Sequence, residues 1–408
     1  MHFPLINGNR LNDRLNAMSQ NGALPEGGVK RLTLTSEDKS ARDLLTNWMK
    51  ALGLVIQVDE MGNMFGILEG KTPNRWIGAG SHLDSVPTGG RYDGPVGVLA
   101  ALEAAETIIE NKIQLNHSLV IANYTNEEGV RFFPDMMGSL AHANPEKVST
   151  LWQSSDTAGI TVKEALQKID YLGSEKCGSI PYDFFVELHI EQGPILEDGN
   201  NDIGVVKNVQ AIHWCRLTIE GKSGHAGTTP IHARKDALHA LGRLSSYARQ
   251  LCYELEHQLI TIGSVEVFPN AINVIPEKVI ATLDIRSPYD ENISKALLRL
   301  EEFMLSDDSF ASLSVETETL VNIPAVEFNP QVTKAIEESC HALGLSYQPM
   351  HSGAGHDAQI LARRYPAAMI FIPSKDGISH AVDEYSSPEQ IEKGANVLLY
   401  TLLKLDQM

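Results

Sequence analysis

The chain is poor in cysteine and in basic residues, and it has no long apolar run. Its four cysteines, spread over 408 residues, form no Cys-X-X-Cys pair, which argues against a disulfide framework and against a zinc–thiolate site. No apolar run approaches the roughly 18 residues of a membrane span, and the first residues lack the basic stretch and apolar run of a secretory signal. These absences favour a cytoplasmic protein without a membrane partner.

Basic side chains are outnumbered by acidic ones. There are 33 Lys and Arg against 52 Asp and Glu, a net charge of −19, and the basic residues form no cluster. Binding of nucleic acid needs a basic surface, so a nucleic-acid partner is excluded. A small anionic substrate would need local positive charge, which metal ions or arginines could supply.

Strands and helices alternate in the outer parts of the sequence. Apolar segments typical of buried strands cover residues 76–83, 118–125, 184–190 and 368–373, and the apolar residues of 97–111 recur at helical spacing. This alternation predicts an α/β fold with a mostly parallel sheet between helices. Ligands of such sheets bind beyond the carboxyl ends of the strands, where this sequence places polar, chemically capable residues.

The middle of the chain follows a different pattern. Strands are expected within 203–220 and at 259–268, 277–286 and 313–320, with helices at 232–256 and 290–305. This βαββαβ order is typical of the ferredoxin-like fold. We therefore expect a catalytic, metal-binding domain formed by residues 1–210 and 326–408, with an inserted ferredoxin-like α+β dimerisation or lid domain at 211–325.

Histidines and carboxylates lie at or just beyond the carboxyl ends of all four strands predicted for the catalytic domain. The candidate metal ligands are His82, Asp93, Glu128, His189 and His380. Taken singly, each has a commoner explanation as a core histidine or a solvated loop residue. Four strand ends that each deliver nitrogen or oxygen ligands and no thiolate instead suit a pair of divalent ions, Zn²⁺ or Mn²⁺, with Co²⁺ or Ni²⁺ also accepted. Two ions roughly 3.5–4 Å apart could activate a water and polarise a carbonyl.

Two more carboxylates accompany these ligands. Glu127 precedes Glu128, and adjacent carboxylates at a buried strand end repel each other unless positive charge lies between them. One of them can ligate a metal while the other holds the attacking water as general base, although a solvated loop is the alternative. Asp84, two residues after His82, can orient the imidazole ring through a hydrogen bond.

Motifs along essentially the whole chain carry a family resemblance. They are GSHLDSVPTGGRYDGPVGVLAALE, TNEEGVRF, VELHIEQGPILE, IEGKSGHAGTTP, PNAINVIPEKV, HSGAGHDAQ and MIFIPSKDGISHA. In this order they resemble the bacterial N-carbamoyl-L-amino acid hydrolase and allantoate amidohydrolase family, a branch of the aminoacylase/carboxypeptidase-type dinuclear metallohydrolases. The resemblance implies a division of the ligands, in which one metal is held by His82 and His189, the other by Glu128 and His380, and Asp93 bridges the two.

The same resemblance implies the catalytic and substrate-binding residues. Glu127 would be the general base, Asp84 would orient His82, and His225 would stabilise the oxyanion, in many relatives across a dimer interface. Asn273 and Arg286 would grip a substrate carboxylate, a task suited to a bidentate arginine. From the residues alone, a turn around Asn273 and a solvated charge at Arg286 are the commoner interpretations. The ureido end of the substrate would be contacted by Gln192, Gly355 and His356.

The motifs disagree about the substrate. HSGAGHDAQ resembles the allantoate branch, whereas SHLDSVPTGGRYDGPVGVLA resembles carbamoyl-amino-acid and ureidopropionate hydrolases. Ile212-His213-Trp214 resembles the carbamoyl-amino-acid branch. We expect hydrolysis of the ureido bond of N-carbamoyl L-amino acids, with release of ammonia, carbon dioxide and the amino acid. The alternatives are an allantoate amidohydrolase, a β-ureidopropionase, a dipeptidase or aminoacylase, and a non-catalytic relative of the same fold. A homodimer is expected, mainly because the family resemblance implies one, and also because an open sheet edge of the small domain can pair with a copy of itself.

Overall fold

The computed structural model describes residues 4–408, and the chain divides into two compact units. One unit joins the chain up to Lys207 with the segment from Glu327 to Met408, and the other spans Asn208–Val326. Among the described residues, none of the helices combines the length and the apolar character needed to cross a bilayer.

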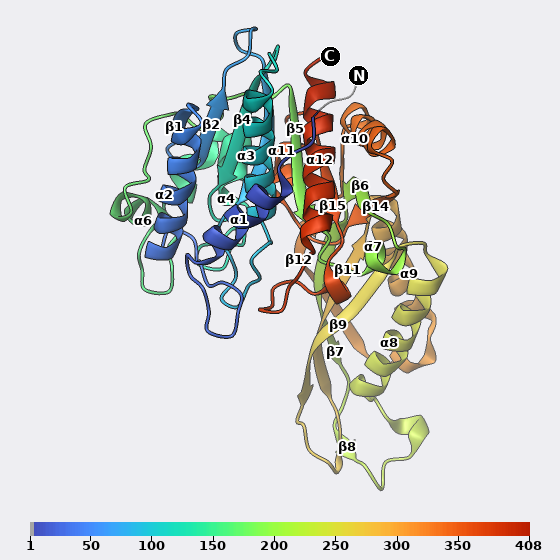
Figure 1. The fold of residues 1–408 in the computed structure, drawn as a ribbon. Coiled ribbons are helices and arrows are strands. Elements are labelled where there is room, and N and C mark those ends of the chain that lie inside the picture. The colour runs from blue at the N-terminus through green and yellow to red at the C-terminus, as the bar shows by residue number, and fades with distance from the viewer. Residues whose placement is uncertain (1–3) are drawn as a thin grey trace. The chain divides into compact units, whose positions relative to one another are not determined.

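The first unit is built on a nine-stranded sheet (Figure 1). Its four central strands run parallel in the order β4-β3-β5-β15, which confirms the predicted mostly parallel sheet, and antiparallel strands flank them. Because the central strands are parallel, their carboxyl ends meet at one edge. The strands are β1 (Val55–Val58), β2 (Met64–Leu68), β3 (Trp76–His82), β4 (Ser118–Tyr124), β5 (Phe184–Ile190), β6 (Ile203–Val209), β13 (Val326–Glu327), β14 (Tyr347–Ser352) and β15 (Ala367–Ile372).

Helices cover both faces of this sheet. On β5, Leu188 contacts Gly394 of α12, while the preceding residue, Glu187, accepts the N–H of Ala358 in α11, so the two helices lie on opposite faces. Figure 1 shows α1, α3 and α12 side by side. The helices of the unit are α1 (Gly8–Ser19), α2 (Ser36–Ala51), α3 (Pro95–Glu110), α4 (Met137–Ala143), α5 (Val148–Leu151), α6 (Val162–Lys168), α7 (Ile195–Asp198), α10 (Pro330–Leu343), α11 (Asp357–Leu361) and α12 (Pro388–Leu405).

The second unit has a four-stranded antiparallel sheet in the order β12-β7-β11-β9. Strand β11 alternates as its sequence predicts, with Val279, Ala281, Leu283 and Ile285 buried in one apolar core with the two long helices. The elements are β7 (Ala211–Glu220), β8 (Gly224–His225), α8 (Ala237–Glu254), β9 (Leu259–Phe268), β10 (Val274–Ile275), β11 (Lys278–Ser287), α9 (Asp290–Ser306) and β12 (Ser314–Ile323).

Candidate active site

The predicted ligands gather at the carboxyl edge of the parallel strands. His82 is the last residue of β3, His189 lies near the end of β5, and Glu128 follows β4. The chain turns sharply there, since Asn126, Gln192 and His380 have positive φ angles of 59°, 60° and 54°. Left-handed backbone in non-glycine residues is costly and clusters at functional sites.

Asp93 lies between two groups of candidate ligands. Its Oδ1 is 3.1 Å from Nε2 of His189 and 3.7 Å from Nε2 of His82. Its Oδ2 is 3.3 Å from Nε2 of His380, which in turn is 3.4 Å from Oε2 of Glu128. The two oxygens of one carboxylate therefore face two separate sets of partners, as a bridging ligand must.

The imidazole rings of His82 and His189 are oriented by backbone carbonyls. Nδ1 of His82 lies 2.9 Å from the carbonyl oxygen of Asp84, and Nδ1 of His189 lies 2.9 Å from that of Ile190. A carbonyl only accepts, so each Nδ1 carries a hydrogen, and in the neutral ring each Nε2 keeps a lone pair that could ligate a metal ion beside Asp93.

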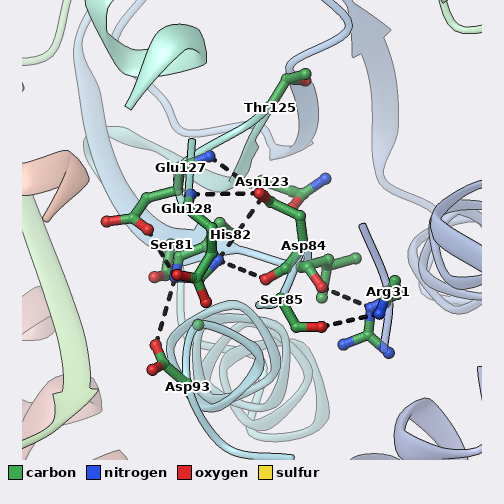
Figure 2. A network of polar contacts seen from close by, with 12 residues as sticks. Arg31, Ser81, His82, Asp84, Ser85, Asp93, Asn123, Thr125, Glu127 and Glu128 are labelled. Atoms are coloured by element: carbon green, nitrogen blue, oxygen red, sulfur yellow. Dashed lines mark hydrogen bonds and ion pairs between the residues drawn. The ribbon is translucent and has the colours of Figure 1, made fainter. Parts of the chain in front are cut away.

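The side chain of Asp84 was expected to orient the His82 ring, but it contacts the main chain of the glutamate pair instead. Its carboxylate is 3.8 Å from Nδ1 of His82, too far to orient the ring, and it instead accepts the N–H groups of Glu127 and Glu128, each at 3.3 Å (Figure 2). Asp84 thus holds His82 through its main chain and the glutamate pair through its side chain, because it lies directly between the ends of β3 and β4.

Glu127 lies against the first group without joining it. Its Oε2 is 3.5 Å from Nε2 of His82, and its side chain is almost fully buried. Burial, with the charges of Asp357 and Glu128, raises the pKa of Glu127 well above its ordinary value. A buried carboxylate of this kind has a high affinity for a proton, which is the property a general base needs.

Negative charge exceeds positive charge at this edge. Burial, with the charges of Asp93 and Asp84, raises the pKa of Glu128 to about 9. Burial opposes ionisation of both members of the Asp93–His189 pair, yet their attraction holds the pKa of Asp93 well below its usual range and raises that of His189 to about 9. Excess negative charge of this kind favours the binding of positive charge at this edge.

These residues fit a pair of divalent cations. Nε2 of His82 is buried and has no hydrogen-bond partner among residues 4–408, although two carboxylates lie near it. Such an unpaired nitrogen is costly unless a ligand satisfies it. The donors are imidazole nitrogens and carboxylate oxygens, the set that Zn²⁺ and Mn²⁺ accept.

The loop between Asp93 and α3 is shaped around His82. Gly94 has a φ angle of 81°, and a Cβ there would lie 2.5 Å from Cε1 of the His82 ring. Only glycine fits so close to the ring in this conformation. This requirement explains the Asp-Gly pair in the sequence.

Two residues that contact the Asp93 loop, Ser379 and the buried Glu384, lie in no sequence pattern that predicts this role. A third group of possible ligands, Glu187, His189 and His356, shares His189 with the first, but the oxygens of Glu187 already accept hydrogen bonds from Ser81 and from the N–H of Ala358.

The residues expected at the ureido end lie in the same unit as the ligands. Gln192 donates to Oδ2 of Asp93 at 2.9 Å, and the ring of His356 packs on that of His189 with centroids 4.5 Å apart. Gly355 lies against the side chain of Met136, 3.0 Å from where a Cβ would stand. Gln192 and His356 therefore lie beside the candidate ligands, and Gly355 lies beside Met136 in the loop that follows Glu127.

The other predicted substrate residues belong to the second unit. His225 and Asn273 are neighbours, since Ala226 donates its N–H to the carbonyl of Asn273. Arg286 lies toward the far end of β11 from them, where Asp284 accepts hydrogen bonds from its Nε and Nη2, both at 2.9 Å. Lys278 and Arg286, eight positions apart on β11, are separated by about 26 Å at roughly 3.3 Å per residue. Within one chain, Asn273 and Arg286 cannot grip the same small carboxylate.

Comparison with known proteins places this geometry in a family. Residues 78–404 match the model of peptidase family M20/M25/M40. The chain belongs to this family. The predicted resemblance is confirmed, because an N-carbamoyl-L-amino-acid amidohydrolase of Rhizobium meliloti is 35% identical over 98% of this chain and 96% of its own length.

Two further known proteins are similar to this chain over almost its whole length. An allantoate amidohydrolase of Bacillus subtilis is 33% identical over 97% of each chain. The crystal structure of an amidase of the hydantoinase/carbamoylase family from Burkholderia multivorans is 38% identical, covers 98% of each chain and has a TM-score of 0.93. Family membership confirms the predicted enzyme class, a metal-dependent hydrolase of carbon–nitrogen bonds.

Proposed function

We propose that this enzyme hydrolyses the terminal ureido bond of N-carbamoyl L-amino acids. The observation that carries the proposal is the position of Asp93, one oxygen facing His82 and His189 and the other facing His380, with Glu127 beside them. Relatives at 33–35% identity that are named for carbamoyl amino acids support the substrate class.

The chain's own residues divide into two metal sites. His82 and His189 would hold one ion, Glu128 and His380 the other, and Asp93 would bridge them. Bound there, two divalent ions would polarise the ureido carbonyl and lower the pKa of the attacking water. The native metal is proposed to be Zn²⁺ or Mn²⁺.

Glu127 would move the protons of the reaction. It takes a proton from water as the water oxygen bonds to the ureido carbon, and it later gives that proton to the terminal nitrogen as the C–N bond breaks. Ammonia leaves, and the remaining N-carboxy amino acid loses carbon dioxide to give the free amino acid. The Oε1 of Gln192 is buried without a hydrogen-bond partner among the described residues, so it is suited to accept from a ureido N–H.

His225 is suited to donate a hydrogen bond to the oxyanion. Its Nδ1 accepts the N–H groups of Gly227 and Thr228 at 3.0 and 3.2 Å. In the neutral ring the hydrogen therefore lies on Nε2, which can donate to developing negative charge.

A homodimer would allow Asn273 and Arg286 to bind the same substrate although they are far apart within one chain. Because Asn273 and Arg286 are at opposite ends of one sheet, a substrate carboxylate bound by both would meet Arg286 of one copy and Asn273, with the adjacent His225, of another. Sedimentation of the active enzyme as a monomer would contradict this arrangement.

A comparison of substrates tests the proposed activity. With Mn²⁺ or Zn²⁺ supplied, ammonia release from a panel of N-carbamoyl L-amino acids should exceed that from allantoate in kcat/KM. The D-enantiomers at equal concentration are the matched control and should react far more slowly. Ammonia release from none of these compounds would contradict the proposal.

Allantoate amidohydrolase is the second candidate. It is favoured by HSGAGHDAQ, which carries Gly355 and His356 next to the ligands, and by the relative from Bacillus subtilis. A higher kcat/KM for allantoate than for every carbamoyl amino acid in the same assay would establish it in place of the first.

A further inference from the structure

The most exposed candidate ligand is held by a loop with a buried anchor. The side chain of His380 is 51% exposed, so packing does little to fix its position. Glu384, four residues later in the same loop, is only 4% exposed. The loop closes on itself between them, since Glu384 donates its N–H to the carbonyl of Ala381.

The carboxylate of Glu384 joins this loop to the one that carries Asp93. Its Oε1 accepts the N–H of Tyr92 at 3.1 Å and that of Asp93 at 3.2 Å, while its Oε2 accepts the hydroxyl of Ser379 at 2.9 Å. Gly90 makes room for this approach, because a Cβ there would lie 2.0 Å from Oε1.

Ser379 extends the connection to the bridging carboxylate itself. Its Oγ lies 3.0 Å from Oδ2 of Asp93 and 2.9 Å from Oε2 of Glu384. A hydroxyl has one hydrogen, so Ser379 lies between the two carboxylates and donates to one of them at a time, while Gln192 donates to the same Oγ at 3.3 Å. The backbone and the side chain of Asp93 are thus both tied to the His380 loop.

We propose that Glu384 is a positioning residue for the metal centre. Glu384 holds Asp93 and the His380 loop in register, so that Asp93 and His380 can both ligate the second ion. The inference rests on the proposed metal site. Loss of a residue that orients a metal ligand in this way typically lowers metal affinity by about 10–100-fold.

At position 384, the length of the side chain, rather than its charge, should determine how tightly the second ion binds. Glu384→Gln keeps an oxygen for the two N–H groups and offers its NH₂ to Ser379, whose hydrogen can then go to Asp93. Glu384→Asp is one methylene shorter and cannot span both loops, and Glu384→Ala makes neither contact. Ser379→Ala removes the hydroxyl that contacts Asp93, Glu384 and Gln192, and it keeps the bonds from the N–H groups of Tyr92 and Asp93 to Glu384.

The matched control is Asp406→Ala. Asp406 is also a buried carboxylate that accepts two successive N–H groups, those of Asn116 and His117, but it lies at the opposite end of β4. Its loss should lower stability as the loss of Glu384 does, and leave metal binding unchanged.

The experiment is calorimetric titration of each metal-stripped variant with Mn²⁺ and Zn²⁺, together with thermal unfolding of the metal-free proteins. We expect weaker binding of the second ion by about 10–100-fold in Glu384→Ala and Glu384→Asp, a smaller loss in Ser379→Ala, and near-normal binding in Glu384→Gln. Wild-type affinity in Glu384→Asp and Ser379→Ala, even with lowered stability, would show a purely structural role and overturn the proposal.

The same titration separates this proposal from the one on which it rests. If the wild type binds no metal, or if Asp93→Ala binds as the wild type does, the metal site itself is wrong. If those two behave as expected and only the Glu384 variants do not, the positioning role alone is wrong. Should Glu384→Ala fail to fold, the Asp and Ser379→Ala variants decide the question.

Discussion

Replacement of Glu127 by Gln is expected to lower kcat by about 10²–10⁴-fold while both metals stay bound. The amide keeps the size of the side chain but cannot take a proton from water or return it to the leaving nitrogen. Because Glu127 contacts His82 without belonging to either ligand group, metal content should be unchanged. Steady-state kinetics with elemental analysis measures both, and kcat and kcat/KM should fall together.

Glu128→Gln provides the contrast for that experiment. Glu128 belongs to the group with Asp93 and His380, so its replacement should lower metal content as well as activity. Glu69→Gln, an exposed position on the same unit, controls for the loss of one negative charge. Activity of Glu127→Gln within tenfold of the wild type would show that the assigned base is wrong.

Removal of the metals is expected to abolish turnover and to destabilise the protein. Without cations, Asp93, Glu127 and Glu128 are left as buried carboxylates close together, and such groups repel each other. An ion present at about a thousand times its Kd stabilises the folded state by about 4 kcal/mol. Activity and thermal unfolding should be measured before and after treatment with a chelator and then after addition of Mn²⁺, Zn²⁺, Co²⁺ or Ni²⁺.

Reversibility is the control for chelation. Activity and unfolding temperature should both return when metal is restored, and Asp93→Ala should resemble the chelated wild type throughout. Full turnover by protein that elemental analysis finds free of metal would contradict a metal-dependent mechanism.

The sequence predicted the sheet and the edge at which the ligands meet. Apolar runs that end just before Asp84 and just before Asn126 mark buried strands. Parallel strands must bring their carboxyl ends together, so the proximity of the ligands followed from strand direction alone. The bridging position of Asp93 came from family resemblance, since a glycine-rich loop has no periodicity that fixes where its carboxylate points.

Two kinds of contact could not be predicted from the sequence: those made by main-chain groups, and those between residues far apart in the sequence. The carbonyls of Asp84 and Ile190 orient two histidine rings, and any residue offers a carbonyl, so no side chain signals that role. Glu384 lies in an irregular loop, and its partner Tyr92 is 292 positions away, so neither carries a pattern that points to the other. The family resemblance assigns Asn273 and Arg286 to the same substrate carboxylate, and only the geometry of β11 shows that they are far apart within one chain.

Anomalous diffraction from crystals of the Mn²⁺- or Zn²⁺-loaded enzyme tests the central claim most directly. The account predicts two peaks roughly 3.5–4 Å apart, one on each side of the Asp93 carboxylate, the first beside His82 and His189 and the second beside Glu128 and His380. A single peak, or one held by Glu187, His189 and His356, would contradict it.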